Sequence, residues 1–300
     1  MASIKFLTYN VWSCEHVAVY RRIRAICEII EHHDPDVIFL QEVTDYIYSL
    51  FQEAPWWGNY HEFSSKEKKQ NDPWPSNSDP FCLVLSKLPA GKVVLPQYRS
   101  SWAVGSPPPP RCPRAGQIPS DLLSAWVYGA RHRLRAATCS LAGPTPSDIG
   151  SVHRRATASA FLEHFDAVHQ PQPNVSGFVL DGNVVLGGDL GWDDDLDGPL
   201  RLGDDGWVDA WRELRGGDEC GGWTYDAVAN PMLRRLGLPV ERRRPDRFIC
   251  KLRDFTLGSI EMVGVEPIPG VTRYDDKGNA LPVLPSHHFG LLLTICPKHN

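Results

Sequence analysis

The chain has 300 residues, of which 42% are hydrophobic and ten are Trp, and this composition excludes a disordered protein. Its formal net charge of −5 does not suit a protein built to hold long duplex DNA, which usually presents a basic face. Apolar runs stay well below the roughly 20 residues that span a bilayer. We therefore expect one domain over residues 1–300, no membrane partner, and a small anionic or small organic substrate rather than long DNA.

The start of the chain alternates between apolar and polar residues over Ile4–Asn10, as a strand does, and lacks the apolar block of a signal peptide. The eight Cys are scattered without a C-x-x-C pair, which is typical of reduced thiols and argues against a zinc module. An intracellular location, cytoplasmic or nuclear, is therefore predicted. No sequence pattern sets an oligomeric state.

An amphipathic helix is predicted from about Val17 to His33, and Pro35 ends it because the residue before proline disfavours helical backbone. Val37–Leu40 is then a short buried strand. A helix over 44–57 and a polar loop over 58–80 follow. The helix buries residues at a spacing of three and four, namely Ile23, Ile26, Cys27 and Ile30.

Beyond residue 80 the pattern predicts several strands, one more helix and an insertion. Strands are expected at Phe81–Leu85, Arg135–Leu141, Val184–Leu186, Phe248–Leu252 and Leu291–Ile295, and a helix at Val152–Val168. The insertion at 105–120 is proline-rich, and we expect it to be exposed, as either a flap or a spacer.

Charged clusters are interpreted first as solvated surface. The basic ones are Arg131/Arg133/Arg135, Arg154/Arg155 and Arg242/Arg243/Arg244. The acidic run Asp193-Asp194-Asp195 with Asp197 could add metal ligands, but a solvated loop is the favoured interpretation.

Polar side chains stand where the predicted strands end or begin: Asn10, Glu42, Asp189, Asp246 and His288. Each could be an ordinary turn or surface residue when taken singly. Their joint placement at strand ends favours a functional site, because a sheet edge is where such side chains converge.

Seven motifs follow one another in the order of a known family: TYN, RRIRAICEIIEHHDPDVIFLQEV, GGD, WVDAW, WTYD, PDRF and SHHFGLL. The chain thus resembles the endonuclease/exonuclease/phosphatase superfamily, and within it the 5′-tyrosyl-DNA phosphodiesterase-like proteins. The resemblance implies a DNase I-like α/β (α+β) fold, a two-layer β-sandwich flanked by helices, with the site at one rim.

The resemblance also implies roles for the strand-end residues. Glu42 would be the principal ligand of a divalent metal, Mg²⁺ or Mn²⁺, with help from Asn10. Asp189 would orient or deprotonate the attacking water, and His288 would contact the phosphoryl oxygen. Asp246 would hold the His288 ring by accepting a proton from its second nitrogen.

Several family positions are substituted. Gly191 stands where the family has Asn, and His287 where it has Asp; the strand around Ser140 lacks the family's phosphate-contacting His. These losses argue against a general nuclease, because removing one transition-state donor can cost about 10²–10³ in rate. Ser140, Trp192 and Arg247 are the candidate substrate-binding residues, although packing is the favoured role of the Trp192 ring.

His287 leaves two alternatives open. It could be a metal ligand that shifts the preference toward Zn²⁺ or another transition metal, or it could point into solvent beside a weak or empty metal site. The leading hypothesis is a metal-dependent phosphoester hydrolase with an altered site. The alternatives are a metal-independent enzyme that uses His288, Asp246 and Asp189 on a small organic substrate, and a non-catalytic binding relative.

Overall fold

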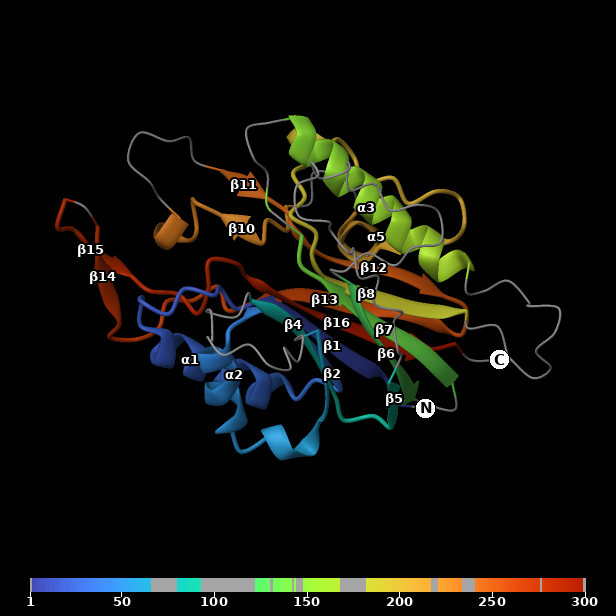
Figure 1. The fold of residues 1–300 in the computed structure, drawn as a ribbon, viewed down its shortest axis with the longest axis horizontal. Coiled ribbons are helices and arrows are strands. Elements are labelled where there is room, and N and C mark those ends of the chain that lie inside the picture. The colour runs from blue at the N-terminus through green and yellow to red at the C-terminus, as the bar shows by residue number, and fades with distance from the viewer. Residues whose placement is uncertain are drawn as a thin grey trace, which may run out of the picture.

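The computed structural model describes residues 2–65, 80–92, 122–129, 132–141, 143, 148–167, 182–216, 221–233, 241–275 and 277–298. Within them two six-stranded sheets pack face to face with helices outside them (Figure 1). The predicted two-layer α+β sandwich of DNase I type is therefore confirmed. The proline-rich segment 105–120 lies outside the described residues.

The first sheet has the order β13-β16-β1-β2-β4-β3 and the second the order β5-β6-β7-β8-β12-β9. The first comprises β1 (Ile4–Asn10), β2 (Val37–Val43), β3 (His61–Ser64), β4 (Phe81–Ser86), β13 (Phe255–Val263) and β16 (Gly290–Pro297). The second comprises β5 (Ala90–Lys92), β6 (Leu122–Gly129), β7 (His132–Cys139), β8 (Asn183–Asp189), β9 (Trp207–Asp209) and β12 (Asp246–Leu252).

Two short ribbons and five α-helices complete the described elements. The ribbons pair β10 (Tyr225–Asp226) with β11 (Arg242–Arg243), and β14 (Thr272–Tyr274) with β15 (Ala280–Pro282). The helices are α1 (Val19–His33), α2 (Asp45–Gln52), α3 (Asp148–Ala167), α4 (Asp194–Asp197) and α5 (Ala210–Arg215), with 3₁₀ turns at Trp57–Asn59 and Pro231–Leu233.

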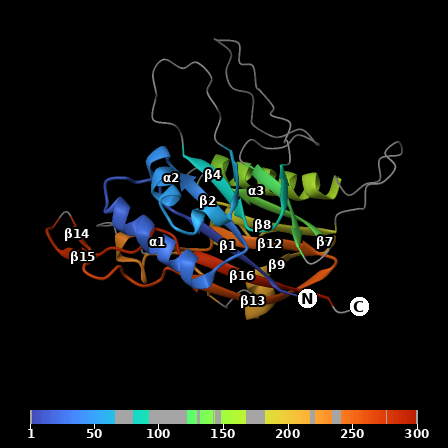
Figure 2. The same cartoon turned by 90° about the horizontal axis from the view of Figure 1, so that it is seen from below.

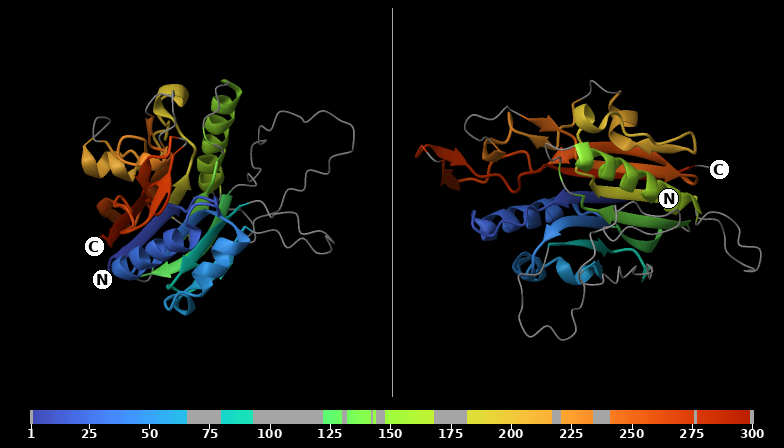
Figure 3. Two further views of the ribbon diagram at one scale, coloured as in Figure 1. Left: turned by 90° about the vertical axis from the view of Figure 1, so that its left-hand side faces the viewer. Right: turned by 45° about the horizontal axis from the view of Figure 1, so that its top comes forward.

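The alternation in β1 sets the layers. Phe6 packs between the sheets with Phe39 and Phe248, whereas Leu7 and Tyr9 face outward into the cluster that contains the α1 residue Ile26. In Figure 2, α1 and α2 lie along the sheet that contains β1 and β2. Figure 3 shows α3 on the opposite side of the sandwich from α1. Each sheet thus has one face in the central core and the other covered by helix.

Strand direction gathers the polar ends at one rim. β1 and β2 are parallel and pair Asn10 with Gln41, so Asn10 and Glu42 leave the first sheet at the same edge. In the second sheet β8 ends where β12 begins, and Asp189 pairs with Asp246. β16 is antiparallel to β1, so the loop that carries His288 returns to that edge.

The Gly-Gly-Asp motif of β8 reflects close packing below the rim. A Cβ at Gly187 would stand 2.5 Å from the Phe248 ring and 2.7 Å from the Phe39 ring, and one at Gly188 would collide with the Cys139 carbonyl. No side chain fits at either position without displacing its neighbours. The two glycines thereby let the layers meet directly beneath Asp189.

The solvated interpretation of the charged clusters is wrong for much of their length. Arg135, Arg154 and Arg244 are each 3–5% exposed. Arg154 reaches both oxygens of Asp197 at 2.8 Å, and this buried pair joins α3 to α4. The acidic run is therefore largely structural: Asp193 caps α4, and Asp194 pairs with Arg212 and Arg247, while Asp195 is exposed. Arg131 lies outside the described residues.

Between residues 44 and 80 the boundaries also differ from prediction. The helix expected over 44–57 ends at Gln52, and the loop expected over 58–80 contains β3, whose residues pair with β4. Among the described helices, none combines the length and apolar character needed to cross a membrane. The intracellular location stays a prediction.

Candidate active site

Glu42 is held by three hydrogen bonds at the end of β2. Asn10 Nδ2 donates to its Oε1 at 2.9 Å, and Ser13 donates to its Oε2 from the backbone at 3.0 Å and from the hydroxyl at 2.9 Å. Burial acts to raise the pKa of Glu42, but the donors from Asn10 and Ser13 outweigh it and the pKa is lowered. Glu42 is therefore an ionised carboxylate aimed by its neighbours.

Asp189 lies beside it, across the two sheets. Its Oδ2 accepts from the same Asn10 Nδ2 at 2.8 Å, and its Oδ1 accepts from the Gly191 backbone at 2.7 Å. Burial, reinforced by the nearby Asp246 carboxylate and opposed by His288, raises the pKa of Asp189 to about 6. Asp189 can therefore take up and release a proton near neutral pH.

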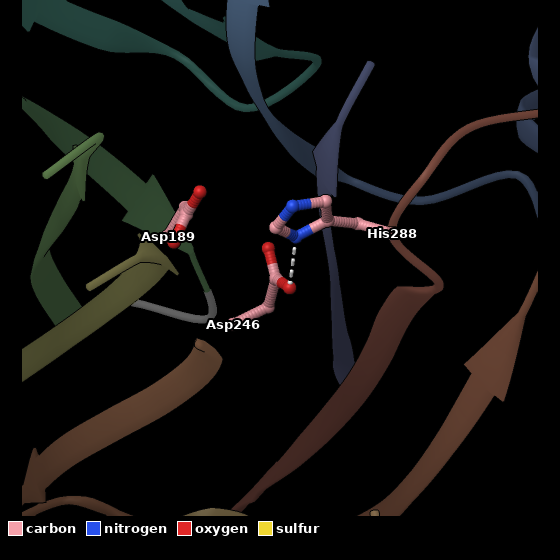
Figure 4. A group of neighbouring side chains, drawn as sticks. All are labelled: Asp189, Asp246 and His288. Atoms are coloured by element: carbon pink, nitrogen blue, oxygen red, sulfur yellow. Dashed lines mark hydrogen bonds and ion pairs between the residues drawn. The ribbon is translucent and has the colours of Figure 1, made fainter. Parts of the chain in front are cut away.

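Asp246 and His288 form a buried pair (Figure 4). His288 Nδ1 lies 2.7 Å from Asp246 Oδ2, which also accepts from the Thr224 hydroxyl at 2.6 Å. Burial by itself lowers the pKa of His288, but the carboxylates of Asp246 and Asp189 outweigh it and raise the pKa to about 9. His288 is therefore a cation at neutral pH, with its ring orientation set by Asp246.

Glu42, Asp189 and His288 line a cleft of about 260 Å³. Its walls include Glu42, Ser140, Asp189, Tyr225, Arg243 and His288. Arg243 lies over the Tyr225 ring, 4.2 Å from its centroid, and binds Glu241 at 3.1 Å. The cleft thus combines the carboxylates of Glu42 and Asp189 with the cationic side chains of His288 and Arg243.

Of the three predicted substrate-binding residues, the structure brings only Ser140 to the cleft. Trp192 is 2% exposed in the cluster that packs α3 on the second sheet. Arg247 is 1% exposed, and its guanidinium binds Asp194 and Asp209 at 2.8 and 3.0 Å. Trp192 is buried by its large apolar surface, and Arg247 is held away from the cleft lining by the carboxylates of Asp194 and Asp209.

His287 packs against an aromatic neighbour in the structure. Its ring stacks on that of Trp12, with centroids 3.5 Å apart and an interplanar angle of 23°. The side chain is half-buried rather than directed into solvent. Its ring does not belong to the group of described residues whose potential ligand atoms cluster within 4.8 Å of one another, which comprises Asp189, Asp246 and His288.

Sequence reasoning missed two contacts of the candidate site. Thr224 stands in the WTYD motif, which signalled the segment but not the bond from its hydroxyl to Asp246. Ser13 lies three residues after Asn10 in no recognised motif, yet it supplies two of the three hydrogen bonds to Glu42. No sequence signal identified Ser13, because its partner is 29 positions away.

The donor set fits a hard divalent cation at Glu42, whose ionised carboxylate lines the cleft. Asn10 faces both carboxylates with its nitrogen, while its Oδ1 accepts from the Trp12 backbone at 3.0 Å. Asn10 therefore holds the carboxylates of Glu42 and Asp189 in place through its side-chain nitrogen. The Asp189–Asp246–His288 group brings three potential ligand atoms within 4.8 Å of one another. The raised pKa of His288, about 9, suits the group to proton transfer as well.

The fold is a phosphoesterase-like sandwich of the DNase I type. Residues 7–269 match the endonuclease/exonuclease/phosphatase family, and the chain belongs to that family. No curated protein matches it in sequence.

Solved structures share the fold at low identity. D. rerio TDP2 complexed with a single-strand DNA product has a TM-score of 0.66 and 19% identity, and the match covers 99% of this chain and 100% of that one. Truncated Caenorhabditis elegans TDP2 has a TM-score of 0.68 and 18% identity over 98% and 97% of the two chains. The human Nocturnin catalytic domain with bound sulfate has a TM-score of 0.56 and 13% identity over 99% and 95%.

Proposed function

We propose that this protein hydrolyses a phosphoester in a divalent-metal-dependent reaction, at a site narrower in substrate than that of a general nuclease. The observation that carries the proposal is the convergence of Glu42, Asp189 and His288 on one cleft. An ionised carboxylate, a carboxylate with a pKa near neutrality and a protonated imidazole are the groups that this chemistry requires.

Each side chain then has a defined part. Glu42 would hold the metal, which when bound neutralises charge on the phosphate. Asp189 orients the attacking water and accepts its proton. His288 donates from its free ring nitrogen to a phosphoryl oxygen, while Asp246 fixes the ring through the 2.7 Å bond to Nδ1. Gly191, where the family has Asn, offers no side chain to the phosphate; its backbone N–H is bound to Asp189.

The charge and size of the cleft favour a small anionic substrate, or a short anionic part of a larger one. Arg243 and His288 supply positive charge within a space of about 260 Å³, while Arg135, Arg154 and Arg244 are buried in the protein and unavailable to a long polyanion. The TDP2 structure with a DNA product concerns a protein of 19% identity, so a DNA end is one substrate class to test beside free nucleotides and other phosphoesters.

The test combines metal binding with turnover. Wild-type protein, Glu42→Ala and a control variant, Glu53→Ala, are titrated with Mg²⁺, Mn²⁺ and Zn²⁺ by calorimetry. Glu53 is an exposed carboxylate directly after α2. We expect Glu42→Ala to lower metal affinity by more than about 100-fold, because mutating residues that only orient a metal ligand already lowers the affinity by about 10–100-fold. Each protein is then assayed on phosphodiester, phosphomonoester and pyrophosphate substrates.

Metal-dependent cleavage of one of these substrates by wild type and Glu53→Ala, together with its loss in Glu42→Ala, would support the proposal. Activity that survives chelation and needs His288 would instead favour the metal-independent enzyme, for which the Asp189–Asp246–His288 group is the specific observation. A biological effect left intact by Glu42→Ala and His288→Ala would identify a binding relative.

Arg243 provides a separate prediction about substrate charge. Arg243→Ala should raise KM about 10–100-fold with little change in kcat, because a charge-assisted hydrogen bond is worth about 1.5–3 kcal/mol. The matched control is Arg242→Ala, since Arg242 stacks on Trp223 and pairs with Asp226 outside the cleft lining. Equal KM values for the two variants would remove Arg243 from substrate binding.

A further inference from the structure

Three planar groups pack together beside the cleft and have no part in the roles proposed above. The His287 and Trp12 rings stack with centroids 3.5 Å apart, and the Arg22 guanidinium carbon lies 4.5 Å from the centroid of the Trp12 ring. We call this group of Trp12, His287 and Arg22 the Trp12 stack. It joins the segment that follows β1 to the loop that precedes β16.

Arg22 makes this junction rigid. It is fully buried on α1, and its guanidinium donates to five backbone carbonyls at 2.5–3.4 Å, those of Val11, Trp12, Cys14, Val17 and Pro285. Four of these acceptors belong to the segment after β1 and one to the loop that leads to His287. A buried guanidinium with satisfied donors resists displacement, because losing its acceptors would leave a charge unsolvated.

The segment held in this way aims Glu42. Trp12 donates its backbone N–H to Asn10 Oδ1 at 3.0 Å, and the next residue, Ser13, donates twice to Glu42 Oε2. Trp12 and Glu42 each have a φ of 58°, in the left-handed region that residues other than glycine rarely adopt. Such conformations persist only where surrounding contacts maintain them.

We propose that His287 is a positioning residue that acts through its ring and not as a metal ligand. By packing on Trp12 it maintains the left-handed conformation there, and this conformation directs the two Ser13 donors at Glu42. The consequence for turnover rests on the proposed function, in which Glu42 holds the metal. The structural part, from His287 through Trp12 to Ser13, stands on the contacts alone.

Three substitutions separate a stacking ring from a ligand. His287→Phe keeps a planar ring and has no ligand atom, His287→Asp has ligand atoms and no stacking ring, and His287→Ala has neither. The first readout is amide hydrogen exchange of residues 11–14 in chelator-treated protein. The second is Mn²⁺ affinity by calorimetry. Thermal melting of each variant confirms that it is folded.

We expect His287→Ala and His287→Asp to speed hydrogen exchange at the Trp12 and Ser13 amides by about three- to tenfold, which corresponds to the free energy of one aromatic pair. His287→Phe should exchange at the wild-type rate. Mn²⁺ affinity should follow the same order. Trp12→Phe retains an aromatic face and should also exchange at the wild-type rate. It provides a second test of the stacking contact if a His287 variant fails to fold.

The opposite ranking overturns the inference: Mn²⁺ binding kept by His287→Asp and lost by His287→Phe identifies a ligand. Equal exchange in all variants overturns it as well. Failure of the proposed function would be seen separately, as a wild-type protein that neither binds Mn²⁺ nor turns over substrate. The order of amide exchange rates among the variants would still decide the role of the His287 ring.

Discussion

Replacing His288 with Ala should lower kcat on phosphoester substrates by about 10²–10³, the usual cost of one transition-state donor. The reason is that the His288 ring is positively charged and that Asp246 fixes its orientation. The carboxylates of Asp246 and Asp189 overcome the effect of burial and raise the pKa of His288 to about 9, so a cation faces the cleft at neutral pH. Steady-state kinetics beside His32→Ala, an exposed His on α1, measures the effect.

Asp246→Asn tests how His288 is charged. It keeps an oxygen for the 2.7 Å bond but removes the negative charge, so the pKa of His288 should fall from about 9 toward or below 6.5. The sign follows from a raised pKa: the pair stabilises the folded protein fully below pH 6.5, and this contribution is lost as the pH rises through about 9. NMR titration of the His288 ring protons, in chelator-treated protein, measures this pKa in wild type and in Asp246→Asn. An unchanged pKa would contradict the assigned cause.

Replacing Asp209 with Ala should lower the free energy of unfolding by about 3–5 kcal/mol, the cost of leaving buried charges without a partner. Asp209 is 4% exposed, and its oxygens accept from Arg244 at 3.1 and 3.2 Å and from Arg247 at 3.0 Å. It also caps α5 through the Trp211 backbone. The two arginines flank Asp246, so the substitution should also loosen the start of β12.

Urea unfolding of Asp209→Ala beside Glu28→Ala provides the comparison. Glu28 pairs with Arg24 on the surface of α1, with both side chains about two-thirds exposed, and such pairs contribute about 0.3–0.5 kcal/mol. A loss below 1 kcal/mol in Asp209→Ala would mean that the Arg244 and Arg247 charges find other partners or reach water. In that case the WVDAW motif would need another explanation.

The strands whose side-chain pattern is local were predictable from the sequence. Phe81–Leu85 and Val184–Leu186 lie inside the observed β4 and β8, because a buried strand requires an apolar run of its own. β13 was not predicted. Its alternation is interrupted by a bulge between Leu257 and Ser259, where Gly258 passes close to Cys296, and the bulge moves the pattern out of register.

The sequence by itself determined the family, the sandwich and the residues at its rim, since strand ends and motif order are written along the chain. Only the tertiary structure decided which way side chains point. It placed the His287 ring on Trp12, turned Arg247 to Asp209, buried Trp192 under α3 and brought Ser13 to Glu42. Each of these outcomes depends on partners distant along the chain, and local sequence periodicity carries no information about partners that only strand register and layer packing bring within reach.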